Sequence, residues 1–244
     1  MTNKYMYFIA NWKMFGGLNS LNSLHKVNKF LKTSKKKSTK IIYCPPSTLI
    51  RPMSKKLKKS SIEVGAQNCH EHETYGAFTG SINSLMLKNV GAKYVIIGHS
   101  ENRQAGETDK LINLKIKSAL KSGLKVIFCI GETFKQKRKR RTKQVLNKQI
   151  KLGLNKINNY KKILIAYEPV WSIGTGLIPK SNELFQTINS IKKIKRNFKV
   201  LYGGSVNPKN INELKSINNI DGFLIGGASQ DPNKFIDIIK KTYN

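Results

Sequence analysis

The amino-acid sequence predicts an α/β fold, a closed (β/α)8 barrel with eight parallel strands inside and helices outside. Eight short runs rich in Ile, Val, Tyr and Phe recur along the chain, and longer segments with helical spacing of apolar residues separate them. Nearly continuous apolar strands are typical of a parallel sheet that is buried on both faces. Repeats of about 30 residues fit a closed barrel better than a doubly wound sheet. No linker, low-complexity stretch or change of composition interrupts the pattern, so we expect one domain over residues 1–244.

Each expected strand is rich in β-branched and aromatic residues, and most of them end in polar residues or glycines that begin a loop. In the first half of the chain they are Tyr5–Asn11, Ile41–Cys44, Ile62–Asn68 and Tyr94–Ser100. In the second half they are Lys125–Glu132, Ile163–Glu168, Lys199–Ser205 and Asp221–Ser229. The first interval shows the helical pattern, with apolar residues on one face at Leu21, Leu24, Val27, Phe30 and Leu31.

The charge of the chain is strongly unbalanced, with 45 basic against 13 acidic residues and a formal net charge of +32. Such a balance can indicate a protein that binds nucleic acid or another polyanion. However, Lys, Asn and Ile are the abundant residues, as A/T-rich codons would give, and the lysines are spread over the whole chain. The one basic block is KQKRKRRTK (Lys135–Lys143), which we expect on an exposed helix. We interpret it as a solvated face and keep a polyanion site there as the alternative.

Cysteine usage and the start of the chain indicate a cytoplasmic protein. The three cysteines, Cys44, Cys69 and Cys129, are odd in number and widely spaced, as expected for free thiols in a reducing compartment. The first residues, MTNKYMYFIANWKM, lack the pattern of a signal peptide. No apolar run approaches the length of a membrane span, so we expect no membrane partner.

Polar side chains and glycines cluster where the expected strands end. Asn11 and Lys13 follow the first strand, His99 and Glu101 the fourth, and Glu168 ends the sixth. Glycine-rich turns follow the last three strands, at Gly174 and Gly176, at Gly203–Gly204–Ser205, and at Gly226–Gly227. In a (β/α)8 barrel all these places lie on one rim, where the loops after the strands build the active site.

The types of these residues suggest proton transfer next to a carbonyl group. A carboxylate beside an apolar Trp and shielded from water becomes a stronger base, and Pro169 biases Glu168 toward an extended backbone. A histidine that begins a helix lies at the positive end of the dipole, which favours neutral imidazole, a hydrogen-bond donor to a carbonyl. Lys13 supplies positive charge, and glycine turns expose backbone N–H groups to an anion. We therefore expect a small phosphorylated carbonyl substrate, with no metal and no cofactor.

Eight motifs together resemble the triosephosphate isomerase family, in its order and spacing and over nearly the whole chain. They are NWKM (Asn11–Met14), GAQN (Gly65–Asn68), GAFTG (Gly76–Gly80), GHSENR (Gly98–Arg103), CIGE (Cys129–Glu132), YEPVWSIGTG (Tyr167–Gly176), YGGSV (Tyr202–Val206) and IGGAS (Ile225–Ser229). The resemblance implies a TIM barrel and an isomerase of glycolysis and gluconeogenesis. Such an enzyme interconverts dihydroxyacetone phosphate and D-glyceraldehyde 3-phosphate through an enediolate, which fits the expected chemistry.

The resemblance also implies a role for each site residue. Glu168 matches the base that shuttles the proton, His99 the neutral electrophile beside the carbonyl, and Lys13 the substrate-binding lysine. Asn11 helps orient the carbonyl end of the substrate, and Ser100 and Glu101 support the turn that carries His99. The backbone grip on the phosphate matches Gly174, Ser205, Gly226 and Gly227. The segment after Glu168 resembles a hinged lid, with a first hinge at Pro169–Trp171 and a tip at Ser172–Gly176.

The family is usually a dimer, in which a loop matching Tyr75–Gly80 inserts beside Lys13 of the partner. Three residues depart from the family pattern in regions used around that contact, namely Phe15, Ser81 and Asn102. In the lid, Ser172 stands where the family usually has Ala, and Leu177–Pro179 form an unusual second hinge. A basic segment replaces the acidic one that usually follows CIGE. These departures leave the site residues in place and bear on dimer strength and lid motion.

Three other readings of the sequence compete with this one. The tract CHEHE (Cys69–Glu73) resembles a metal-binding run, but it has no distant pair of ligands, so we expect a solvated loop. Other phosphosugar barrel enzymes, such as aldolases and epimerases, would need a Schiff-base lysine in a strand, a metal or a second acid/base group, and none is evident. Nucleic-acid or polyanion binding remains possible beside the enzyme activity.

Overall fold

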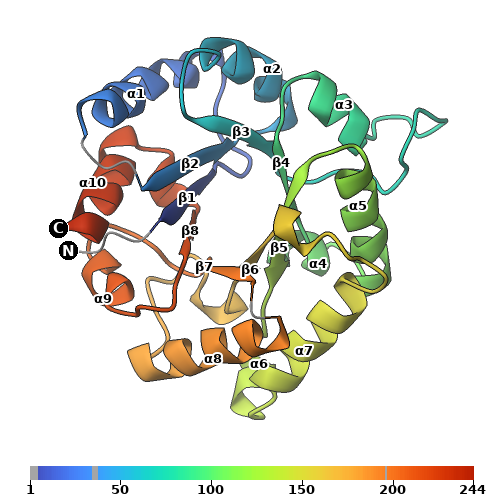
Figure 1. Cartoon of the computed structure of the whole chain (residues 1–244), viewed down its shortest axis with the longest axis vertical. Coiled ribbons are helices and arrows are strands. Elements are labelled where there is room, and N and C mark those ends of the chain that lie inside the picture. The colour runs from blue at the N-terminus through green and yellow to red at the C-terminus, as the bar shows by residue number, and fades with distance from the viewer. Residues whose placement is uncertain (1–4, 35–37, 196) are drawn as a thin grey trace.

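The computed structural model describes residues 5–34, 38–195 and 197–244, and eight parallel strands within it close into a barrel (Figure 1). Of the domain expected over residues 1–244, residues 1–4, 35–37 and 196 lie outside the described part, and with them the first four residues of the segment tested for a signal peptide. The strands pair in chain order and β8 pairs with β1, which closes the barrel. They are β1 (Met6–Asn11), β2 (Thr39–Cys44), β3 (Glu63–Ala66), β4 (Tyr94–Ile97), β5 (Lys125–Ile130), β6 (Ile163–Tyr167), β7 (Lys199–Tyr202) and β8 (Gly222–Ile225).

Helices surround the barrel on the outside, as Figure 1 shows. The longer ones are α1 (Leu24–Thr33), α2 (Ser47–Lys56), α5 (Asp109–Lys121), α7 (Thr142–Gly153), α8 (Ser181–Ile194) and α10 (Pro232–Tyr243). The shorter ones are α3 (Ser84–Asn89), α4 (Ser100–Gln104), α6 (Phe134–Arg138) and α9 (Ile211–Lys215), with 3-10 turns η1 (Leu18–Ser23), η2 (Tyr160–Lys162), η3 (Val170–Ser172) and η4 (Gly227–Ser229). None of the described helices has the length and apolarity needed to cross a bilayer.

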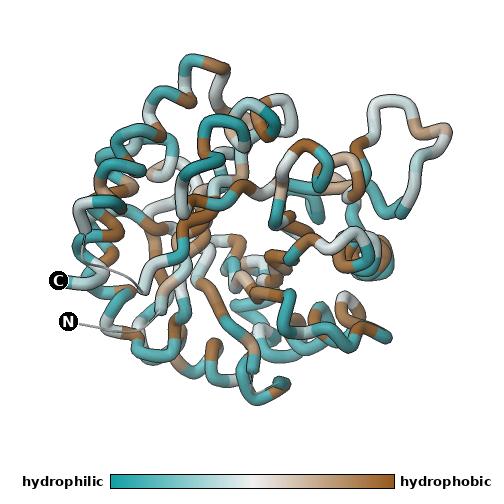
Figure 2. Tube along the Cα trace, turned by 45° about the horizontal axis from the view of Figure 1, so that its top comes forward, coloured by the Kyte–Doolittle hydropathy of each residue, from teal (hydrophilic) through white to brown (hydrophobic). Residues whose placement is uncertain are grey.

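The alternation of side chains along each strand divides the apolar core into two layers. In β1, Ile9 packs in the barrel interior, whereas Phe8 and Ala10 pack in the layer between the sheet and the helices. Both sets are fully buried, so the strands read as nearly continuous apolar runs. In Figure 2 the strands are mostly brown, whereas the outer helices alternate between teal and brown, as amphipathic helices on a core should.

The eight expected strands are confirmed, but several end earlier than their apolar runs suggested. The fourth was expected to continue to Ser100, yet β4 ends at Ile97, because Gly98 adopts a left-handed φ of +76° and a helix begins at Ser100. The eighth was expected to continue to Ser229, yet β8 ends at Ile225 and the 3-10 turn η4 follows. Both shortened ends turn the chain into the rim where the polar residues lie.

The basic block Lys135–Lys143 was expected on one exposed helix, and that expectation is wrong in part. Helix α6 ends at Arg138, the backbone turns through a left-handed φ of +55° at Arg140, and α7 begins at Thr142. The residues of this turn are exposed, whereas Lys137 is half-buried against the first hinge of the lid. Thus the block is divided between a solvated turn and a structural contact.

Candidate active site

Of the polar residues expected at the strand ends, Asn11, Lys13, His99 and Glu168 line one cavity of about 300 Å³ at the carboxyl end of the barrel, whereas Glu101 does not. A cavity of this size fits a small metabolite and not an extended chain. The expected catalytic and binding residues on its wall are Asn11, Lys13, His99, Glu168, Gly174, Ser205, Gly226 and Gly227. Residues that lie more than 200 positions apart in sequence therefore meet here because the barrel is closed.

Glu168 is held at the end of β6 by its backbone. Its N–H donates to the carbonyl of Ile130 over 2.8 Å, which extends the pairing of β6 with β5 by one residue. Gly131 lies against this point so closely that a Cβ there would be 1.7 Å from the carbonyl oxygen of Glu168. Only a glycine fits at position 131. This close approach fixes the backbone position from which the side chain of Glu168 extends.

The carboxyl group of Glu168 is almost completely removed from water, with 2% of the residue exposed. Burial raises the pKa of this carboxyl group, while interactions with His99, the thiol of Cys129, the amide of Ser100 and the charge of Lys13 reduce the rise. The net pKa lies above the ordinary value, so the carboxylate is a stronger base than one in water. Its Oε1 lies 3.4 Å from Nε2 of His99, so the two groups can act on the same small molecule.

His99 is oriented by the turn that begins α4. It is the N-cap of this helix, and its Nδ1 accepts the backbone N–H of Glu101 over 3.2 Å. Because Nδ1 accepts this bond, a neutral ring carries its proton on Nε2, the nitrogen near Glu168. Arg103 stabilises the turn, since its Nε donates to the carbonyl of Gly98 over 2.7 Å.

Lys13 has a strained backbone, with a left-handed φ of +55°, which is uncommon outside glycine. Neighbouring polar groups hold it there: its N–H donates to Oδ1 of Asn11 over 3.1 Å, and its carbonyl accepts Nε2 of Gln67 over 2.8 Å. Its ammonium lies 2.5 Å from Oε1 of Glu101. Partial burial acts to raise the pKa of Glu101, but the hydrogen bond from Lys13, the interaction with His99 and the charge of Lys13 outweigh it and lower that pKa.

The opposite wall of the cavity consists mainly of glycine backbone. Gly174 has a left-handed φ of +73°, and a Cβ on Gly203 would lie 2.8 Å from Cγ of Glu168. A Cβ on Gly226 would lie 3.5 Å from Cε of Lys13, so this glycine leaves room beside the ammonium stem. The 3-10 turn η4 begins at Gly227, and the first N–H groups of a helical turn have no partner within it. This wall therefore suits a phosphate dianion that Lys13 would also attract.

The segment expected to form the first hinge of a lid, Pro169–Trp171, is anchored by a buried carboxylate. Glu132 accepts Nε1 of Trp171 over 2.9 Å and the hydroxyl of Tyr167 over 3.2 Å. Burial raises the pKa of Glu132, and these hydrogen bonds oppose the rise. From the other side, Nζ of Lys137 lies 3.7 Å from the centre of the Trp171 indole ring, a cation–π contact.

Four residues that position this site received no role from the sequence, namely Gln67, Arg103, Gly131 and Glu132. All of them lie inside motifs that the resemblance identified, GAQN, GHSENR and CIGE. The motifs could therefore have indicated that these four residues matter to the site. Their partners lie in other loops, however, and only the folded chain brings them together.

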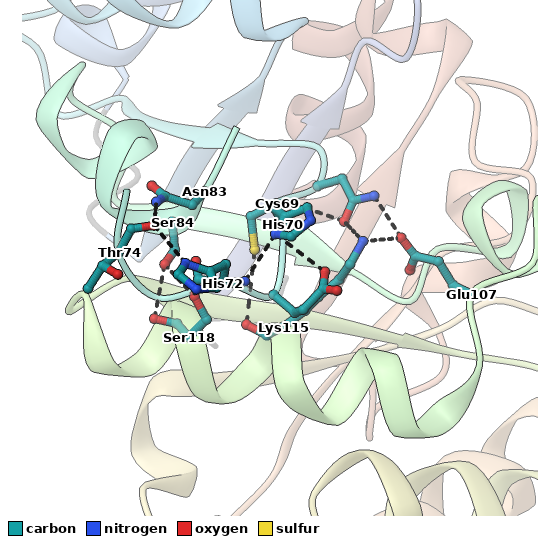
Figure 3. A network of polar contacts seen from close by, with 11 residues as sticks. Cys69, His70, His72, Thr74, Asn83, Ser84, Glu107, Lys115 and Ser118 are labelled. Atoms are coloured by element: carbon teal, nitrogen blue, oxygen red, sulfur yellow. Dashed lines mark hydrogen bonds and ion pairs between the residues drawn. The ribbon is translucent and has the colours of Figure 1, made fainter. Parts of the chain in front are cut away.

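The CHEHE tract forms the base of a loop that projects from the barrel between β3 and α3 (Figure 1). His70 and His72 stack on Phe78, with ring centres 4.6 and 4.8 Å apart. Figure 3 shows the polar network below this base, in which Lys115 pairs with Glu107 on one side of the histidines. Within residues 5–34, 38–195 and 197–244 no group of three or more His, Cys, Asp or Glu side chains is arranged to hold a metal ion.

Comparisons with known proteins agree with this geometry. A family model described as triosephosphate isomerase matches residues 6–242. The triosephosphate isomerase of Dictyoglomus thermophilum is 43% identical, over 95% of this chain and 97% of the relative, and that of Thermodesulfovibrio yellowstonii is 41% identical, over 96% and 98%. The crystal structure of triosephosphate isomerase from Bartonella henselae superimposes with a TM-score of 0.88 at 33% identity, over 98% of this chain and 100% of that one. The chain belongs to the triosephosphate isomerase family.

Proposed function

We propose that Glu168, His99 and Lys13 carry out the interconversion of dihydroxyacetone phosphate and D-glyceraldehyde 3-phosphate, the activity of the triosephosphate isomerase family. The observation that carries this assignment is the pair of Glu168 and His99, whose Oε1 and Nε2 lie 3.4 Å apart on the wall of a cavity of metabolite size. A base and a hydrogen-bond donor at this spacing can act on a carbon and on the neighbouring carbonyl oxygen.

The proposed reaction moves one proton between two adjacent carbons. Glu168 takes the proton from the carbon next to the carbonyl, and the electron pair of that C–H bond forms the C=C bond of an enediolate while the carbonyl oxygen gains negative charge. The Nε2–H of His99 donates a hydrogen bond to this oxygen, and the charge of Lys13 stabilises it. Glu168 then returns the proton to the other carbon, while the hydroxyl proton on the first oxygen passes to the former carbonyl oxygen. The carbonyl and hydroxyl groups are thereby exchanged, and the enzyme ends in its initial state.

We assign the phosphate of the substrate to the glycine wall and to the backbone of Ser205. Gly174, Gly226 and Gly227 supply a surface without side chains, and Asn11 orients the carbonyl end beside Lys13. Ser100 and Glu101 support His99 through the turn of α4. Closure of Ser172–Gly176 over the phosphate would exclude water from the enediolate.

We further propose that the active form is a homodimer of single-domain subunits in the cytoplasm. Apolar side chains are exposed just after Lys13, where Met14 is 101% exposed, and on the projecting loop, where Phe78 is 44% exposed. Exposed apolar side chains of this kind are typical of an interface, and the loop Tyr75–Gly80 is the segment we expect to reach the partner. All three cysteines are buried and unpaired, which suits a reducing compartment.

A coupled assay of the interconversion in metal-free buffer tests the assignment. Glu168→Gln keeps the shape of the side chain but removes the base, so we expect kcat to fall by about 10²- to 10⁴-fold. Glu213→Gln, which changes an exposed carboxylate on α9, is the matched control and should keep full activity. A Glu168→Gln enzyme with wild-type turnover would exclude Glu168 as the base.

A further inference from the structure

The hydroxyl of Ser172, at the start of the lid tip, makes three polar contacts with residues outside the tip. It is fully buried, and its Oγ lies 2.5 Å from the carbonyl oxygen of Leu177 and 2.9 Å from the hydroxyl of Tyr202. The backbone N–H of Ser205 also points at Oγ, over 3.3 Å. One side chain at the start of the lid thus joins the second hinge and the loop after β7.

The direction of these three bonds follows from the atoms available. A carbonyl oxygen can only accept, so Ser172 gives its single proton to Leu177. The hydroxyl of Tyr202 and the N–H of Ser205 must then both donate to the two lone pairs of Oγ. All hydrogen-bonding positions of the Ser172 hydroxyl are therefore occupied. An alanine at this position would take the shared acceptor away from the Tyr202 hydroxyl and from the Ser205 N–H.

The surroundings show that this arrangement is packed around the hydroxyl. A Cβ on Gly204 would lie 2.3 Å from the Tyr202 hydroxyl and 2.7 Å from Oγ of Ser172, so only glycine leaves room for the pair. Within the lid tip, Oγ1 of Thr175 donates to the carbonyl of Ser172 over 3.1 Å. The tip is thus braced internally and connected to the β7 loop through Ser172.

One of these donors is a group that the substrate is expected to use. The N–H of Ser205 belongs to the phosphate grip assigned above, and in this structure it donates to Ser172. This N–H has a single proton, so it cannot form a full hydrogen bond to a phosphate oxygen and to Oγ of Ser172 at the same time. Binding of the phosphate must therefore displace or weaken the contact that connects the lid to the β7 loop.

We propose that Ser172 is a positioning residue that holds the lid on the β7 loop and competes with the substrate phosphate for the N–H of Ser205. This inference rests on the proposed function, since it takes the phosphate site from there. Phosphate binding then breaks the contact that holds the lid in its present position, because the arriving anion replaces the hydroxyl as acceptor of the Ser205 N–H. The tip Ser172–Gly176 becomes free to close over the anion. The hydroxyl acts through Ser205 and does not touch the reacting carbons.

Ser172→Ala is the direct test, and inorganic phosphate is the probe. Removal of the competing acceptor should lower the Kd for phosphate, measured by fluorescence of Trp171 at the first hinge, by about 3- to 10-fold, the factor that one hydrogen bond is worth. The KM for the triose phosphate should fall with it. A purely structural role predicts the opposite, a looser lid with weaker phosphate binding, and unchanged or weaker binding would overturn the inference.

Tyr202→Phe is the second variant. It removes one donor to Ser172 but leaves Oγ as the acceptor of the Ser205 N–H, so phosphate binding should not tighten. Tightening equal to that of Ser172→Ala would overturn the competition at Ser205. Ser190→Ala is the control, because the Ser190 hydroxyl donates to the carbonyl of Thr187 within α8, and it should change neither constant.

The wild-type enzyme separates this inference from the function on which it rests. If phosphate does not compete with the triose phosphate in the wild type, the assigned phosphate grip itself is wrong. If phosphate competes in the wild type but Ser172→Ala leaves its Kd unchanged, only the role of Ser172 is wrong. Thermal unfolding of each variant confirms that both measurements are made on folded protein.

Discussion

The buried environment of Glu168 makes its carboxylate a stronger base and at the same time lowers the stability of the folded protein. Burial makes the carboxylate a stronger base, because a charge removed from water holds a proton more readily. The same burial penalises the ionised form that the reaction requires. His99 and Lys13 offset part of this penalty, so the charge survives in the cavity.

The raised pKa of Glu168 has a consequence for stability that can be measured. The folded chain holds this proton more tightly than the unfolded chain does, where the pKa has its ordinary value of 4.5. The contribution of the group to stability is therefore complete below that value and is lost as the pH rises through the raised pKa. We expect Glu168→Gln to unfold at a higher temperature than the wild type at pH 7.5, with no difference at pH 4.

Thermal unfolding at these two pH values decides this prediction, with Glu213→Gln as the exposed control. The stabilisation should appear only in the neutral sample and only in the Glu168 variant. A stabilisation of equal size at both pH values would mean that packing and not ionisation is responsible.

Among the elements, the lid depends on contacts from outside its own segment. Trp171 lies between the buried carboxylate of Glu132 and the ammonium of Lys137, and Lys137 also reaches Oε1 of Glu183 on α8 over 2.9 Å. The half-buried part of the basic block thus connects α6, the lid hinge and α8. The pattern of charged residues in the sequence could not distinguish Lys137, which makes these contacts, from the solvated basic residues beside it.

Lys137→Met should lower the free energy of unfolding by about 1 kcal/mol, since it removes the cation–π contact and the pair with Glu183. Lys135→Met removes an equal charge from an exposed site of the same helix and should change this free energy by less than about 0.5 kcal/mol. Urea unfolding followed by circular dichroism measures both. Equal losses in the two variants would show that Lys137 contributes only charge.

For the whole molecule, charge and apolar surface act against each other. Each copy of the chain carries a formal charge of +32, so two copies repel each other over long range. The exposed apolar side chains after Lys13 and on the projecting loop favour association at short range. Salt screens the first effect and leaves the second nearly unchanged.

We therefore expect the dimer to dissociate more readily at 10 mM than at 150 mM salt, as measured by sedimentation velocity over a range of protein concentrations. Phe78→Asp, which places a charge in the proposed interface, should give monomers at both salt concentrations. A wild-type dimer of equal affinity at both concentrations would contradict the role of charge repulsion.

Polyanion binding by the turn Arg138–Arg141 would show the opposite salt dependence, since added salt weakens it. The same sedimentation experiment with a single-stranded oligonucleotide therefore separates the two effects of charge. Binding to the oligonucleotide that survives 150 mM salt would support the alternative reading of the basic block.

Much of the fold and of the site could be predicted from the sequence, because the necessary signals are local. The apolar runs gave eight strands, and the residues at their ends gave the rim, since every parallel strand presents its carboxyl end on the same side of a barrel. Glu168, His99 and Lys13 were recognisable by type and motif before any distance was known. The strand ends were less predictable, because Gly98 and η4 turn the chain within an apolar run.

The sequence by itself determined the barrel, the rim and the identity of the residues on it, because hydrophobic periodicity and motif order are properties of neighbouring residues. Only the tertiary structure decided the support of those residues: the close approach of Gly131 to Glu168, the strained backbone of Lys13 held by Gln67, and the three bonds of Ser172. Apart from the bond between Ser172 and Leu177, these contacts join loops that are separated by tens of residues in the chain. Their geometry depends on barrel closure, so no local pattern in the sequence encodes it.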